Sequence, residues 1–210
     1  TVPATVGGVS TGSALASGGG NLALDAAKGL LYYTNNDPGG AASLFAYNFN
    51  TNTHVLISAN LNGPPANVLN MGFGTSGGGA TYYNGAYWLE VESPGNTGRI
   101  YKVNLAADGL SVTGASWFAS LTAAQGNTAN DLLYVDNGTV STADDKLVVV
   151  MSDGINIQIF DPNDPNGTTG GAVPVTATNG VGANVSGQSP RSQIATTQTG
   201  LTFIGGGGPT

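Results

Sequence analysis

Cysteine is absent from this sequence and histidine occurs once, at position 54. Without cysteine, the chain has no disulfide framework, no thiolate nucleophile and no cysteine metal site. A single histidine leaves little material for a zinc site or a conventional serine–histidine–aspartate triad. His54 stands among Thr53, Val55 and Leu56 on a predicted strand, where we interpret it as an ordinary strand-face residue. No cofactor fingerprint is present, so the sequence leaves catalysis open but favours a role that is not enzymatic.

Charged residues are also scarce. The chain has 5 basic and 12 acidic residues among 210, which is 8% and far below the usual quarter. Its net charge of −7 comes without any basic cluster, which argues against a nucleic-acid partner. Weak charge also leaves little long-range repulsion between copies, so self-association costs little electrostatic free energy. The sequence therefore favours the chain itself as a partner.

Long apolar runs and the usual residues of helix surfaces are missing too. No apolar run approaches the roughly 20 residues that span a bilayer, so we predict no transmembrane segment. The apolar residues, 40% of the chain, fall in short runs rather than helical stripes. A surface of Asn, Thr, Ser and Gly is typical of exported proteins, and a start at Thr1 suits a processed form. We expect an all-β protein that is extracellular or located at the cell surface.

A small-residue turn followed by a short apolar strand recurs four times, about every 55 to 60 residues. The strands are 30–33, 86–89, 146–150 and 201–204, and in the first three copies a second strand follows at 43–49, 99–105 and 156–160. Asn84-Gly85 and Asp153-Gly154 are typical hairpin turns. The pattern predicts a β-propeller-like array of about four antiparallel units. A β-sandwich or jelly roll built from the same hairpins is the alternative.

The predicted organisation is an N-terminal segment, 1–20, followed by one β-repeat domain, 21–210. The segment is strand-capable, and the fourth unit lacks the outer strands of a complete blade. Open strand edges invite pairing with another chain, so a segment lent by a neighbouring copy would build a filament. The residues of this predicted assembly contact are Val2, Val6, Val9, Ile194, Leu201 and Phe203.

Residues 79–88 (GATYYNGAYW) and 98–105 (GRIYKVNL) together resemble one blade of secreted bacterial β-propeller-like repeat proteins. Residues 45–49 (FAYNF) and 157–162 (IQIFDP) resemble the second strand of such a blade. The resemblance spans roughly residues 21–204 and implies a secreted propeller-like scaffold. The motif is generic, so it implies no particular activity.

Aromatic and acidic residues of the second unit offer an alternative function. Tyr87 and Trp88 would stack on sugar rings if they projected from a rim, although such residues more often fill the core of a β-repeat. Glu90 and Glu92 are the only glutamates, and on a strand they face the same side. Such a pair suits the acid and base of a glycosidase, but is more often a solvated strand face.

Two further patterns concern calcium and glycosylation. The run 161–167 (DPNDPNG) is dense in hard oxygen ligands, so calcium is the one cofactor that the sequence suggests, although these residues are also standard turn formers. Its predicted ligands are Asp161, Asn163 and Asp164. Three Asn-x-Ser/Thr sequons would accept glycans in a source that uses them, at Asn137, Asn166 and Asn184.

From these observations we expect a non-enzymatic extracellular structural or adhesive protein, with a self-assembling filament subunit as its specific form. The alternative is a carbohydrate-binding module, or a glycan-active enzyme, that uses a propeller face. Copies of the chain and glycans are the expected partners.

Overall fold

A computed structural model describes residues 1–11, 22–35, 43–59, 61, 79–93, 97–121, 129–136, 138, 141–151, 156–163, 173–176, 191–197 and 200–206. For residues 173–176, 191–197 and 200–206, it describes the backbone pairing alone. The regular elements in these ranges are strands, apart from one 3₁₀ turn, η1 (Thr142–Asp144). The predicted all-β class is therefore confirmed. None of the described helical residues forms a segment with the length and apolar character that crossing a membrane requires.

Three four-stranded antiparallel sheets follow one another along the chain. The first sheet is β3 (Ala23–Asp25), β4 (Leu30–Thr34), β5 (Leu44–Asn48) and β6 (Thr53–Ser58). The second sheet is β7 (Ala80–Tyr83), β8 (Ala86–Ser93), β9 (Thr97–Leu105) and β10 (Val112–Ser120). The third sheet is β11 (Ala129–Val135), β12 (Lys146–Met151), β13 (Asn156–Phe160) and β14 (Val173–Thr176).

Two hairpins complete the described strands. They are β1 (Thr5–Val6) with β2 (Val9–Ser10), and β15 (Arg191–Thr197) with β16 (Gly200–Gly206). The strands predicted from the repeat are confirmed, and each sheet adds a strand before the predicted turn. Every described pairing joins strands that are consecutive in the chain, without the long-range pairings of a jelly roll. The jelly-roll alternative therefore does not describe these sheets.

The turn between β7 and β8 shows how local sequence sets the register. Asn84 and Gly85 both have positive φ, 44° and 81°, as the type I′ hairpin requires. Tyr83 pairs with Ala86 across this turn, which confirms the predicted hairpin. Asp153-Gly154 lies outside the described residues, but β12 and β13 on either side of it pair antiparallel as expected.

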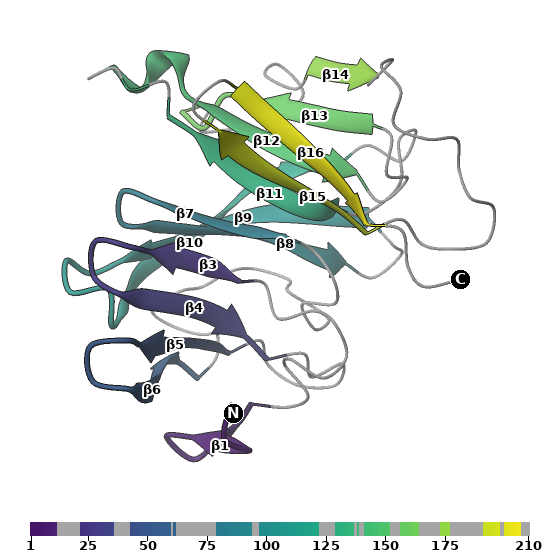
Figure 1. The fold of residues 1–210 in the computed structure, drawn as a ribbon. Coiled ribbons are helices and arrows are strands. Elements are labelled where there is room, and N and C mark those ends of the chain that lie inside the picture. Colours follow the sequence, from purple (N-terminus) through teal and green to yellow (C-terminus); the bar gives the residue numbers. More distant parts are fainter. Residues whose placement is uncertain are drawn as a thin grey trace.

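The sheets stack face to face in chain order (Figure 1). The first strand of each sheet contacts the first strand of the next, so β3 meets β7, β7 meets β11, and β11 meets β15. Side chains alternate across β8, and the second sheet therefore serves two cores. One core joins it to the first sheet and includes Tyr32, Leu44, Tyr87, Leu89 and Tyr101. The other joins it to the third sheet and includes Trp88, Ile100, Leu132, Leu147 and Phe160.

Polar and aromatic contacts also cross between the sheets. The buried Tyr32 hydroxyl donates to the Gly109 carbonyl of the β9–β10 turn at 3.1 Å. The rings of Tyr83 and Tyr134 stack with centroids 4.1 Å apart and planes 7° from parallel. The Tyr134 amide donates to Thr81 Oγ1 at 3.2 Å. These contacts fix the lateral position of each sheet on its neighbour.

Gly79, directly before β7, lies where the second sheet packs against the backbone of the third sheet. A Cβ atom at this position would lie 2.2 Å from both Asp131 Cα and Leu132 N on β11. Backbone atoms of a paired strand cannot move aside as the end of a flexible side chain does. Glycine is therefore required here by packing against the next sheet.

We expect Gly79→Ala to lower the free energy of unfolding by about 1–3 kcal/mol, because the added methyl group forces β7 and β11 apart. Gly114→Ala on β10 is the matched control, since a Cβ there meets nothing within 4 Å. Urea denaturation of the two variants and the parent protein measures the difference. Equal stability of the two variants would contradict the close stacking.

Candidate functional site

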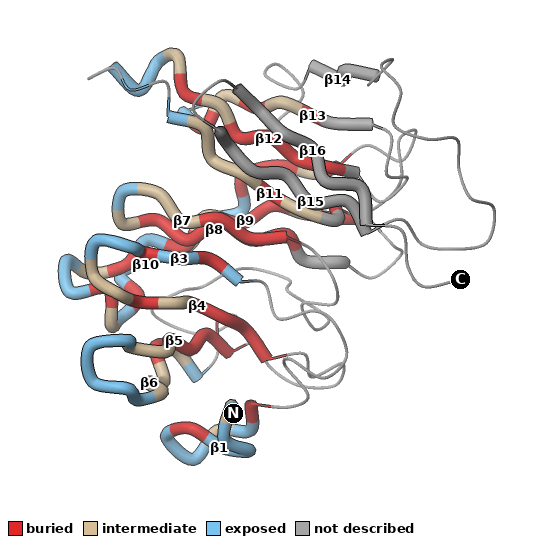
Figure 2. Tube along the Cα trace, viewed as in Figure 1, coloured by how far each residue is buried: buried red, intermediate tan, exposed pale blue. Residues whose placement is uncertain are grey.

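The structure buries most of the residues predicted to contact carbohydrate. Tyr87, Trp88 and Glu90 are 0%, 1% and 0% exposed (Figure 2). Because the second sheet is covered on both faces, both sets of alternating side chains on β8 point into cores. The prediction that these three residues form an exposed binding surface is therefore wrong. Glu92 lies on β8, and its side chain is outside the described part.

Trp88 shows what these aromatic residues do instead. Its ring packs edge-to-face against Phe118, with centroids 5.0 Å apart and planes at 90°. Lys102 Nζ lies 5.0 Å from the ring centroid, at the distance of a cation–π contact. Trp88 thus ties β8 to β9 and β10, as the core interpretation of the second unit implies.

The predicted assembly residues fall into two groups. Val6 is buried against Tyr33 and Phe45, with Val2 and Val9 partly buried beside it. The β1–β2 hairpin therefore packs on the first sheet of its own chain. Docking on the last sheet of a neighbouring copy stays a prediction.

The other three assembly residues are Ile194 on β15 and Leu201 and Phe203 on β16. Their backbones pair as Ile194 with Phe203 and Thr196 with Leu201. Their side chains lie outside the described part of the chain. Contacts that these three side chains would make with another copy therefore also stay a prediction.

The predicted calcium loop begins with a short turn. Asp161 Oδ1 accepts a hydrogen bond from the Asn163 backbone amide at 2.8 Å. Asp164 lies outside the described residues, and within them no group of three or more acidic or histidine side chains gathers at one point. Calcium binding stays a prediction. The sequon residues Asn137, Asn166 and Asn184 also lie outside the described ranges.

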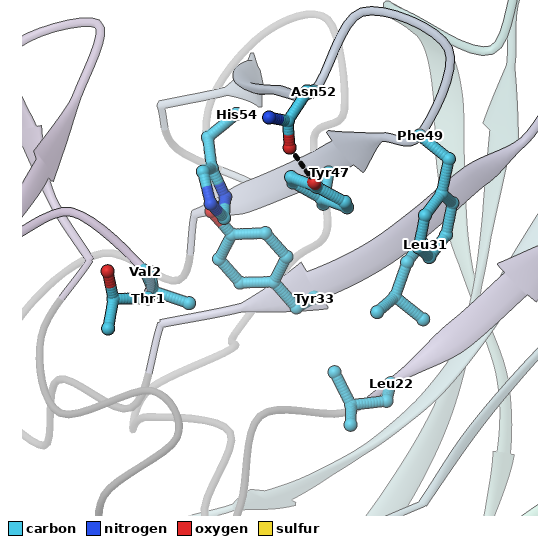
Figure 3. Close-up of a pocket in the computed structure, with 9 residues that line it drawn as sticks. All are labelled: Thr1, Val2, Leu22, Leu31, Tyr33, Tyr47, Phe49, Asn52 and His54. Carbon is cyan, nitrogen blue, oxygen red and sulfur yellow. Dashed lines mark hydrogen bonds between the residues drawn. The ribbon is translucent and has the colours of Figure 1, made fainter.

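An open cleft lies on the face of the first sheet that points away from the second sheet. It encloses about 590 Å³, between the chain's first two residues and strands β4 to β6 (Figure 3). This is the size of an ordinary small-molecule site, about 300–1,000 Å³. The lining consists of Thr1, Val2, Leu22, Leu31, Tyr33, Tyr47, Phe49, Asn52 and His54.

Aromatic rings form a continuous group along this cleft. Tyr33 stacks on the buried Phe45 at 5.2 Å between centroids and meets the edge of His54 at 5.8 Å. Tyr47 lies 4.9 Å from His54 and 5.0 Å from Phe49. Each ring is held by a neighbour, so the cleft is largely pre-formed.

Neutral polar groups accompany the rings. The Tyr33 hydroxyl lies 2.9 Å from His54 Nδ1, and the Tyr47 hydroxyl donates to Asn52 Oδ1. Burial raises the pKa of Tyr33 to about 12 and lowers the pKa of His54 below its usual 6.5. Both side chains are therefore neutral at pH 7, and the cleft combines aromatic surface with uncharged hydrogen-bonding groups.

One end of the cleft is covered and the other is open. The β1–β2 hairpin covers Tyr33, which is 2% exposed. At the open end Leu22 and Phe49 are 46% and 54% exposed, and the neighbouring Leu24 is 53% exposed. Large apolar side chains exposed together on one face indicate a binding surface more than scattered single residues do.

Sequence reasoning missed this cleft, although one signal for it was present. Phe45, Tyr47 and Phe49 alternate along one strand region and so face the same side. His54 pairs with Tyr47 on the adjacent strand, which brings the single histidine into the same group. Nothing in the sequence indicates which face of the first sheet another sheet covers.

Comparisons with known proteins supply no further guide to this site. No protein-family model matches the sequence, and no curated protein matches it.

We expect Val6→Asp to release the β1–β2 hairpin, because a carboxylate replaces an apolar side chain buried against Tyr33 and Phe45. Amide exchange of residues 5–10, followed by mass spectrometry, should accelerate at least about tenfold, since burying a valine is worth about 1.5–3 kcal/mol. Thr5→Asp is the matched control, because Thr5 is exposed on the same strand. Equal exchange in both variants would show that the hairpin is not held by Val6.

Proposed function

We propose that the described sheets are blades of a β-propeller-like array. Two observations support this architecture. Each complete sheet is a four-stranded antiparallel meander, and successive sheets meet through their first strands. Radial repetition of such meanders, with first strands innermost, is the blade arrangement of propellers. The resemblance of residues 79–105 to a secreted propeller blade agrees with this proposal.

On this scaffold we propose a non-enzymatic extracellular structural or adhesive protein that holds its ligand in the cleft of the first sheet. One observation carries the proposal: a pre-formed aromatic cleft is open at Phe49, on a sheet whose other face is locked into the core. Its described lining supplies stacking surfaces and neutral hydrogen-bonding groups, which is chemistry for holding a ligand. The scarcity of charge and the Asn, Thr, Ser and Gly surface support an extracellular setting.

Phe49→Ala tests this assignment. We expect binding of the labelled protein to an array of glycans, peptides and lipid vesicles to fall at least about tenfold, because the exposed ring is lost from the cleft. Trp117→Ala is the matched control, since Trp117 is 52% exposed on β10 and does not line the cleft. Retained binding in Phe49→Ala, or no binding by the parent protein, would refute adhesion through the cleft.

Self-assembly into a filament is the second candidate, and the β1–β2 hairpin favours it. The hairpin packs on the first sheet through a small apolar cluster around Val6, and Asn35 Nδ2 donates to the Ser10 carbonyl at 3.5 Å. A neighbouring copy's hairpin would make the same contact, so exchange between copies requires no new interface. Exchange in one direction would link copies head to tail.

For this second candidate we expect sedimentation velocity to show species that grow with protein concentration. Val6→Asp should return the protein to a single monomeric species, whereas Thr5→Asp should assemble like the parent. Negative-stain electron microscopy of the same samples reports whether the assemblies are ordered. A parent protein that sediments as a monomer at every concentration would refute hairpin exchange.

A further inference from the structure

We propose that the ligand of the cleft is an uncharged carbohydrate, one or two sugar rings long, that packs a ring face on Phe49. This inference rests on the proposed function, because it names the ligand class of the same site. It differs from the sequence-based carbohydrate prediction in every residue, since Tyr87, Trp88 and Glu90 are buried in the sheets.

The open end of the cleft presents an aromatic surface. The Phe49 side chain is 54% exposed, and Tyr47 supports it edge-to-face at 5.0 Å. An aromatic ring that is held by its neighbour and still exposed offers a flat apolar platform. The C–H face of a pyranose ring is complementary to such a platform, because it is flat, apolar and weakly positive against the negative aromatic face.

Polar side chains lie beside that platform. Asn52 lines the cleft, and its Oδ1 accepts from the Tyr47 hydroxyl. His54 and the Tyr33 hydroxyl lie deeper, 2.9 Å apart. Sugars carry hydroxyl groups around the edge of an apolar ring, so they need donors and acceptors at the rim of a stacking surface. A purely apolar ligand would cover this rim without offering its groups a hydrogen bond in place of water.

The charges of the cleft and of the whole protein favour a neutral sugar. Lysine, arginine, aspartate and glutamate are absent from the described lining, and the imidazole of His54 is neutral at pH 7. The protein as a whole carries −7. The positive amino group of Thr1 lies near His54, but the described lining offers an acidic sugar no lysine or arginine side chain, and the net charge of the protein would repel it. The geometry therefore favours neutral hexoses or N-acetylhexosamines over uronic acids and sulfated sugars.

The single histidine makes the test simple, because its ring signals report on the cleft without further assignment. The ¹⁵N-labelled protein is titrated with cellobiose, maltose and N,N′-diacetylchitobiose while the His54 ring resonances are followed by NMR. We expect a saturable shift with at least one of these neutral disaccharides, and about tenfold weaker binding in Phe49→Ala. Trp117→Ala should bind like the parent protein.

Asn52→Gly provides an independent variant. Asn52 has φ of 55°, which glycine adopts without strain, so the turn is kept while the amide is lost. We expect this variant to bind the disaccharide several-fold more weakly and to unfold at the same urea concentration as the parent. Unchanged affinity in both Asn52→Gly and Phe49→Ala would overturn the site.

Two further ligands test the carbohydrate assignment separately from the adhesive function. Digalacturonic acid is the charged counterpart, and an Ala-Leu-Phe-Leu-Ala peptide is the apolar one. A Phe49-dependent shift with either, and none with the neutral sugars, would overturn the carbohydrate assignment while leaving adhesion through the cleft intact. The absence of a saturable shift with every neutral disaccharide would also overturn the carbohydrate assignment. This holds whatever the array of glycans, peptides and vesicles shows about adhesion through the cleft.

Discussion

The close approach of successive sheets through their first strands is the constraint on which this structure depends. Between Gly79 and the backbone of Asp131 and Leu132, no side chain separates the second sheet from the third. This approach buries both faces of the second sheet, with Tyr87 on one side and Trp88 on the other. Because every four-stranded sheet is a local meander, chain connectivity alone does not hold one sheet on the next. Packing between the faces of neighbouring sheets holds them together.

The same constraint explains why the binding surface lies on the first sheet. Its inner face is locked against the second sheet through Tyr32 and Leu44, so only the outer face is available. The β1–β2 hairpin covers part of that face with Val6 and presents exposed small residues outward. What remains is a cleft whose rings are fixed from behind by a rigid sheet. Pre-formed rings lose little conformational entropy when a ligand arrives, which suits weak and reversible adhesion.

Local patterns predicted much of this fold, and long-range packing explains what they missed. Alternation and turn chemistry located the strands, and the Asn84-Gly85 hairpin has the two positive φ values that its sequence predicts. The local patterns did not predict which strand faces are buried. The sequence places both Trp88 and Phe49 on strands, yet Trp88 is 1% exposed and Phe49 is 54% exposed. That difference depends on which sheet lies across from each face, and the first strands of contacting sheets begin about 50 to 60 residues apart in the chain. Val6 likewise packs on a sheet whose strands begin well after it, which no local pattern encodes.

The stacked sheets should unfold as one unit, because each depends on its neighbour's face. Amide hydrogen exchange of the intact protein, resolved by residue with NMR, measures whether they do. We expect the middle strands β4, β5, β8, β9 and β12 to share one opening free energy and to respond equally to added urea. A first sheet that exchanges through its own opening, at a much lower free energy and with the second sheet still protected, would show that the sheets do not unfold together.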